Sequence, residues 1–172
     1  MRTIATRASS RRARVATANG GANAPGAGHR LALTVQSSVD TAHLPKRPAL
    51  RRWVAAALER DAHVTLRFVG GREGRALNRR YRDRDYATNV LTFVYDDGVS
   101  LTGDIVLCAP VVAREARAQR KTLAAHCAHL VIHGMLHLQG YDHERDAAAA
   151  RMEAREIALL RDLGYGNPYG GG

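Results

Sequence analysis

Three histidines in the C-terminal third of the chain have the spacing of ligands to one metal ion. His133 and His137 are four residues apart in a segment predicted to be helical, so both imidazoles leave the same helix face one turn apart. Gly140 ends that helix and lets the chain double back, which brings His143 toward them. Three neutral imidazoles leave the fourth tetrahedral position open for water, as in catalytic zinc sites. The pattern predicts one zinc ion bound by these histidines.

Two neighbouring polar residues are candidates to support the ligands. Asp142 adjoins His143 and is expected either to accept the distal N–H of a ligand histidine or to be a solvated turn acid. His129 lies four residues before His133 on the same helix face. We expect His129 to lie beside the site or pack near it, because the motif already has three ligands.

Gly134 follows the first ligand and bears on the class of chemistry. A zinc peptidase helix reads H-E-x-x-H, and its glutamate acts as the general base. This chain has glycine at that position. Peptide hydrolysis is therefore disfavoured, although the ligand geometry of a peptidase is present.

The elements that must position these residues are read from hydrophobic periodicity. Alternating or β-branched runs predict strands at 31–36, 63–69, 89–95 and 104–108. Helical spacing predicts helices at about 50–58, 110–121, 122–139 and 145–163, and a short arginine-rich helix anchored by Leu77 and Tyr81. We expect an α+β fold with a small mixed four-stranded sheet and about five helices. The apolar helix 122–139 is expected at the centre, carrying the ligands as in a metalloprotease.

Strand pairing is predicted only in part. The turn at 96–98 favours antiparallel pairing of 89–95 with 104–108, and 104–108 is placed at a sheet edge. The order of the other strands does not follow from the pattern.

Charge divides the chain unevenly. The net charge is +10, yet residues 1–30 hold six arginines and no acid, which leaves 20 basic and 16 acidic residues, or +4, in 31–172. The composition therefore favours a nucleic-acid partner only moderately. We expect residues 1–28 to be a disordered basic leader or an over-extended start site, although their composition weakly resembles a transit peptide. After them we expect a single catalytic metal-binding domain at 29–166 and a flexible tail at 167–172.

Two cysteines and the absence of a long apolar run bear on the compartment. Cys108 and Cys127 lie in apolar runs and are expected as buried thiols in a reducing compartment. No apolar run in the sequence is long enough to span a membrane. A cytoplasmic location without a membrane partner is expected.

Two stretches of sequence resemble the YbeY family, the bacterial endoribonucleases of ribosomal RNA maturation. The first is the eleven-residue run HGMLHLQGYDH at 133–143, and the second includes Leu77-Asn78, Tyr81-Arg82, Asp85 and TNVLTF at 88–93. The resemblance extends over about 31–169. Ala87, Thr92 and Val94 depart from the family pattern of proline, serine and proline, and none of them is a ligand.

The resemblance implies a function and assigns site residues. It implies a metal-dependent endoribonuclease of single-stranded RNA that acts on 16S-type ribosomal RNA at the 3′ end of the small subunit, in ribosome maturation and quality control. It implies His133, His137 and His143 as ligands of zinc, or of nickel or another divalent metal, and Arg82 as a catalytic residue. From the residues alone, Arg82 belongs to an arginine-rich helix face, but a guanidinium is suited to clamp a phosphate.

Two alternatives stay open at the level of sequence. One is a ribosome-assembly factor that binds ribosomal RNA and uses its metal mainly for structure. The other is a metal hydrolase with a substrate other than RNA. Arg114, Arg117 and Lys121 share one helix face and are interpreted either as a track for RNA phosphates or as a solvated face.

Overall fold

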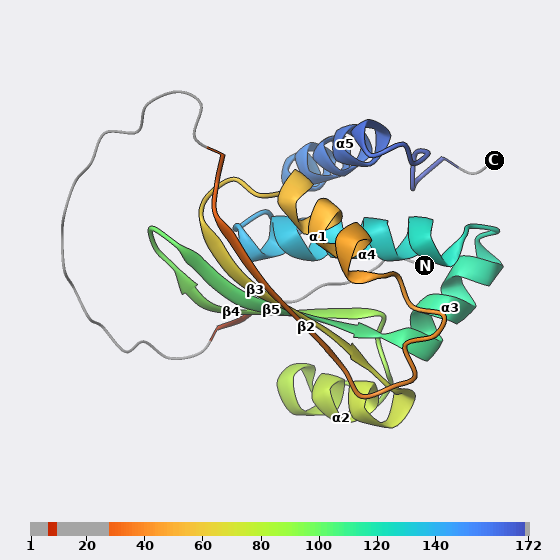
Figure 1. The fold of residues 1–172 in the computed structure, drawn as a ribbon. Coiled ribbons are helices and arrows are strands. Elements are labelled where there is room, and N and C mark those ends of the chain that lie inside the picture. The colour runs from red at the N-terminus through yellow and green to blue at the C-terminus, as the bar shows by residue number, and fades with distance from the viewer. Residues whose placement is uncertain (1–6, 10–27, 171–172) are drawn as a thin grey trace.

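The computed structural model describes residues 7–9 and 28–170, and within them five strands form one mixed sheet (Figure 1). The strands lie in the order β1-β4-β5-β3-β2. They are β1 Arg7–Ser9, β2 Leu31–Ser37, β3 Ala62–Val69, β4 Val90–Asp97 and β5 Leu101–Cys108. β4 and β5 pair antiparallel, and the other neighbouring pairs are parallel.

β5 is the central strand of the sheet. It pairs with β3 on one side and β4 on the other, and its last four residues, 105–108, are all buried. Such a continuous apolar run is typical of a strand covered on both faces. The predicted antiparallel pairing of 89–95 with 104–108 is confirmed. The predicted edge position of 104–108 is wrong, because this strand pairs with β3 on one side and with β4 on the other.

Five helices in the described part of the chain cover this sheet. They are α1 Arg47–Ala56, α2 Gly71–Arg82, α3 Ala109–Ala118, α4 Leu123–Leu138 and α5 Asp146–Asp162. α1, α4 and α5 lie on one face, and α2 lies on the other (Figure 1). The larger core fills the first face, including Trp53, Leu66 and Leu136, whereas Leu91 and Val106 belong to a smaller core that packs with Leu77 of α2. The α+β class, with a mixed sheet and a buried central helix, is confirmed.

α4 is the helix that the rest of this layer surrounds. Thr122 caps its N-terminus, where the side-chain oxygen accepts a hydrogen bond from the backbone N–H of Ala125 at 3.1 Å. Every residue from His126 to Leu138 is buried. The helix lies close to β5 at Gly134, where a Cβ would stand 2.9 Å from Cγ2 of Ile105. The helix therefore holds its polar side chains in a dry, closely packed layer.

The two ends of the chain differ from expectation where the structure describes them. Residues 7–9 form β1 beside β4, although the sequence assigns them to a disordered leader; residues 1–6 and 10–27 lie outside the described residues. At the other end, within the expected flexible tail, Pro168 accepts a hydrogen bond from Lys121 and Tyr169 donates one to Glu156. No helix in 28–170 has the length and apolar character that crossing a membrane requires.

Candidate metal centre

One face of α4 carries four histidines in a line. His126, His129, His133 and His137 are spaced three or four residues apart, which places them on successive turns of the same face. All four are buried. Burying these polar rings destabilises the fold unless each ring has a hydrogen-bond partner or binds an ion. The partners of each ring therefore indicate its role.

The turn after α4 brings in the fifth histidine. Gly140 has φ +95°, a left-handed conformation that favours glycine. The N–H of Tyr141 donates to the carbonyl of Leu136 at 3.0 Å and the N–H of Gly140 to that of His137 at 3.1 Å, which together form a Schellman cap. The chain reverses there, and the ring of His143 lies 5.0 Å from that of His137, centroid to centroid.

The three predicted ligands are brought together. One nitrogen from each of His133, His137 and His143 lies within 4.8 Å of the others. Two ligands on one tetrahedral zinc ion stand about 3.4 Å apart, and Nε2 of His133 is 3.1 Å from Nε2 of His137. The cluster therefore has the dimensions of a site for one ion.

The hydrogen bonding of these rings also fits a cation. Nδ1 of His133 donates to the Glu156 carboxylate at 2.5 Å, so Nε2 of His133 presents its lone pair. The backbone of Tyr141 hydrogen-bonds the His137 ring, and Nε2 of His143 is buried without a hydrogen-bond partner among the described residues. Lone pairs gathered in a buried space repel one another unless a cation binds them. The residues present fit a divalent metal ion.

Burial and neighbouring rings keep His137 neutral. Burial lowers the pKa of His137 to about 3, and the nearby His133 and His143 add to that shift. A neutral imidazole is the form that binds a metal. His137 is thus in its ligating form across the neutral pH range.

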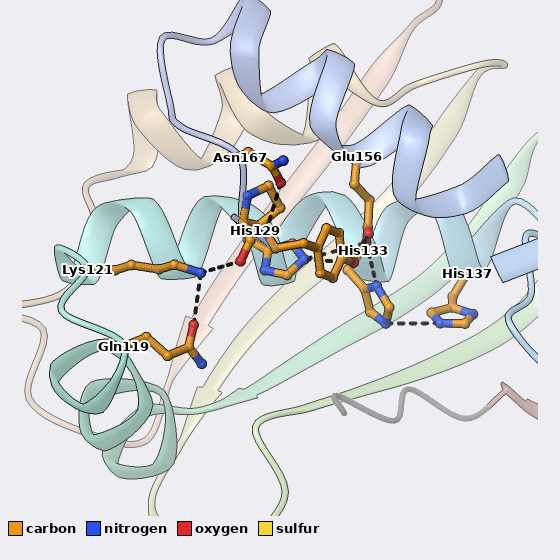
Figure 2. Close-up of polar contacts among 9 residues, drawn as sticks. Gln119, Lys121, His129, His133, His137, Glu156 and Asn167 are labelled. Atoms are coloured by element: carbon orange, nitrogen blue, oxygen red, sulfur yellow. Dashed lines mark hydrogen bonds and ion pairs between the residues drawn. The ribbon is translucent and has the colours of Figure 1, made fainter. Parts of the chain in front are cut away.

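Glu156 is the site residue that the sequence reasoning missed. It comes from α5, is fully buried, and contacts the ring of His133 (Figure 2). Burial raises the pKa of a carboxyl, but the interactions with His129 and His133 outweigh burial and hold the pKa of Glu156 at about 2. A buried carboxylate that accepts the distal N–H of a ligand histidine fixes the ring's tautomer and orientation.

A signal for Glu156 is present in the sequence. The four buried residues of α5 are Met152, Glu156, Leu159 and Leu160, spaced as one apolar stripe. An acid in that stripe is exceptional, because an unpaired charge is not stable in a core. The stripe predicts a buried partner for Glu156, though not which one.

The two candidate supporting residues lie in different places. His129 is beside the network, with Nε2 3.7 Å from Oε1 of Glu156. Asp142 is exposed, and its Oδ1 accepts the backbone N–H of Glu144 at 2.5 Å. Glu156, rather than Asp142, therefore provides the carboxylate at His133, and Asp142 shapes the turn that carries His143.

Arg82 lies at the last residue of α2, half-buried, on the other side of the sheet from α4. Burial lowers the pKa of its guanidinium, while the neighbouring Tyr86 raises it. Both helices reach β4: Tyr81 packs edge-on against Phe93 at 4.9 Å between ring centroids, and Val90 and Val94 belong to the core that contains α4. Arg82 and the histidines thus flank one strand.

Comparison with known proteins shows which family has this sequence. The family model described as Endoribonuclease YbeY matches residues 37–164. The chain belongs to the YbeY family. The matched stretch contains Arg82, the three histidine ligands and Glu156, and it ends before the C-terminal residues 165–170.

Two YbeY relatives match over nearly their whole length. The chain is 58% identical over 146 residues to the Endoribonuclease YbeY of Aromatoleum aromaticum, covering 83% of this chain and 95% of that one. It is 54% identical over 137 residues to that of Nitrosomonas eutropha, covering 80% and 97%. The solution structure of TM1509 from Thermotoga maritima superposes with a TM-score of 0.51 at 26% identity, over 76% of this chain and 91% of that one. The fold and family therefore agree.

Proposed function

We propose that this chain is a metal-dependent endoribonuclease that cleaves single-stranded RNA. The observation that carries the proposal is the cluster of three imidazole nitrogens within 4.8 Å, in a chain that belongs to the YbeY family. The relatives are named endoribonucleases, which makes RNA the substrate class. The wider role that we propose is maturation of the 3′ end of small-subunit ribosomal RNA and ribosome quality control, in the cytoplasm.

The resident metal that we propose is one zinc ion. Three imidazoles suit zinc, and they also accept nickel or another divalent ion. Such an ion acts as a Lewis acid toward a phosphate oxygen or a water molecule. The protein's part is to keep three imidazole nitrogens converging and to hold the ring of His133 through Glu156.

Arg82 is proposed to hold the RNA phosphate. Arg82 is half-buried and lies on the face of the sheet opposite the histidines. Partial desolvation strengthens a charge-assisted contact to a phosphate. Lysine would keep the charge but lose the two-pronged geometry.

A second basic surface supports an RNA partner. Four arginines of α2 line a shallow hollow of about 520 Å³: Arg72, Arg75, Arg79 and Arg80. Within it, Arg75 forms a two-pronged pair with Asp85 at 2.9 and 2.7 Å.

Lys121, which the sequence offered as part of a basic track for RNA, is engaged within the protein. Its Nζ donates to Gln119 and to the carbonyl of Pro168, rather than being presented to RNA.

The test is cleavage of a fragment carrying the 3′ end of small-subunit ribosomal RNA. Wild-type protein is expected to cut it, whereas His137→Ala and Arg82→Ala lose at least about a hundredfold of the rate. His43→Ala and Arg84→Ala remove an exposed residue of each type and are the matched controls.

The outcomes separate the alternatives. Equal cleavage by both site variants would mean a contaminating nuclease and refute the proposal. RNA binding that survives metal removal, with no cleavage by any form, would favour an assembly factor with a structural metal. A protein that binds the metal but neither binds nor cleaves RNA would favour a substrate other than RNA.

A further inference from the structure

The residues after α5 fold back along α4. Gly164 has φ +87°, and the N–H of Tyr165 donates to the carbonyl of Leu160 at 2.8 Å, which turns the chain at the helix end. The ring of Tyr165 then packs edge-on against Trp53 in the core, 6.1 Å between centroids. This C-terminal segment, residues 164–170, is therefore docked at its start.

The C-terminal segment is also docked at its far end. Nζ of Lys121, just before α4, donates to the carbonyl of Pro168 at 2.6 Å. Oδ1 of Asn167 accepts the backbone N–H of Tyr169 at 2.9 Å, which forms a tight turn. Figure 2 shows Asn167 above the start of α4, over His129. These contacts bring the side chain of Tyr169 over the histidine row.

Tyr169 reaches the buried carboxylate behind the metal ligands. Its hydroxyl donates to Oε2 of Glu156, and its ring lies edge-on to that of His129 at 5.4 Å between centroids. The ring is 45% exposed, so it stands between Glu156 and solvent. A hydrogen-bonded chain thus runs from the Tyr169 hydroxyl through Glu156 to Nδ1 of His133.

The two oxygens of Glu156 have different partners, and this division matters. Oε1 accepts from His133 at 2.5 Å, while Nε2 of His129 is 3.7 Å from the same oxygen. A carboxylate that was free to rotate would offer either oxygen to either ring. With Tyr169 donating to Oε2, the carboxylate is held in the one orientation that serves His133.

We propose that Tyr169 and Glu156 are positioning residues of the metal centre, which hold His133 in its ligating tautomer and orientation from outside the ligand set. The C-terminal segment is then a working part of the centre. The inference depends on metal binding at the three histidines and does not depend on the substrate being RNA.

The test measures metal binding directly. The dissociation constant of zinc is obtained by competition with a chromogenic chelator, and the cobalt(II) form gives a visible spectrum that reports ligand geometry. Glu156→Gln is expected to weaken zinc binding about 10- to 100-fold, the usual effect of losing an outer hydrogen-bond partner. Tyr169 is one hydrogen bond further from the metal than Glu156. Tyr169→Phe is therefore expected to weaken zinc binding about three- to tenfold and to shift the cobalt spectrum.

Matched controls come from the same two segments. Tyr165→Phe removes a hydroxyl of the C-terminal segment, and Glu153→Gln neutralises an exposed acid of α5. Both are expected to bind zinc within about twofold of wild type, with an unchanged cobalt spectrum. Thermal unfolding of the metal-free variants reports any general loss of packing.

Three results would overturn the inference. In the first, Tyr169→Phe keeps wild-type zinc affinity and an unchanged cobalt spectrum. In the second, Tyr165→Phe weakens binding as much as Tyr169→Phe, which would make the effect general to the segment. In the third, the loss of zinc affinity in Glu156→Gln and Tyr169→Phe is fully accounted for by the loss of stability of the metal-free variants. If wild-type protein binds no zinc, nickel or cobalt, the proposed function fails instead, and the variants are not needed to show it.

Discussion

At the scale of single residues, His143 is the ligand that depends most on a turn. It is delivered by the reversal at Gly140 and leaves a buried nitrogen without a partner among the described residues. A ligand that binds only the folded state stabilises it by up to about 2.7 kcal/mol at a hundredfold excess over its dissociation constant. We expect zinc to raise the unfolding temperature of wild-type protein, and we expect His143→Ala to lose that rise.

The measurement is thermal unfolding with zinc and with a chelator. His43→Ala, which removes an exposed histidine, should keep the full zinc-dependent shift. A His143→Ala protein that zinc stabilises as much as wild type would show that this residue is not a ligand.

The convergence of the three histidines could be predicted from the sequence because it depends on local spacing. His133, His137 and His143 lie on one helix and its following turn, so their spacing alone sets their geometry. Glu156 lies 23 residues beyond His133, and its position beside that ring depends on how α5 docks. Nothing in the sequence near the ligands contains that information.

At the scale of elements, the contact between α4 and β5 leaves no room at Gly134. A Cβ there would stand 2.9 Å from Cγ2 of the fully buried Ile105. Overpacking of this kind costs about 1–3 kcal/mol, and the better helix propensity of alanine recovers about 1 kcal/mol. Gly134→Ala is expected to lower the urea midpoint of unfolding, with Gly166→Ala, which meets nothing within 4 Å, as the control.

This contact also explains why Gly134 stands where a zinc peptidase has its general-base glutamate. Position 134 faces the sheet rather than the metal, so it has no space for the side chain of a general base. An unchanged or higher urea midpoint in Gly134→Ala would contradict this account of the packing.

Glu115 joins three elements and gives a pH dependence. It lies on α3, and its Oε2 accepts from Nδ2 of Asn89 at 2.9 Å and pairs with Nε2 of His126 on α4 at 2.8 Å. Burial raises the pKa of Glu115, but these hydrogen bonds outweigh it and hold the pKa below its ordinary value of 4.5. A lowered folded pKa gives stability that is present above the unfolded value and lost as the pH falls through the folded one.

The expected result is a steeper loss of stability on acidification for wild type than for Glu115→Gln. Urea unfolding at a series of pH values from about 6 to 3 measures it. Glu144→Gln, at an exposed position, should follow wild type. Parallel profiles for wild type and Glu115→Gln would refute the assignment.

At the scale of the whole molecule, the arginine-lined hollow on α2 lies on the face opposite the metal site. Arg72 and Arg79 line the hollow on α2, beneath the sheet in Figure 1. Each phosphate contact to single-stranded RNA adds about 0.7 to the slope of log affinity against log salt. Arg72→Glu with Arg79→Glu is expected to weaken RNA binding and reduce that slope by about 1.4.

The control reverses the same amount of charge on α5, at the exposed Arg151 and Arg161. Binding of a single-stranded RNA is measured across salt concentrations for both double variants. If both lose the same slope, the effect is one of net charge and the hollow has no special role.

The sheet order is the part of the fold that the sequence could not provide. Local periodicity located the helices and strands β2 to β5, but the pairing of β5 with both β3 and β4 depends on contacts between distant segments. The apolar run at 105–108 carried a hint, since a strand buried on both faces belongs in the interior.

All three ligands come from the eleven residues 133–143, and this has a consequence for the denatured state. An unfolded chain keeps these histidines close together, so it retains some affinity for the same ion. Metal binding to the denatured ensemble offsets part of the stabilisation of the native state. The contact to Glu156 exists only after α5 docks. This distant carboxylate therefore adds to the preference of the ion for the folded protein over the unfolded one.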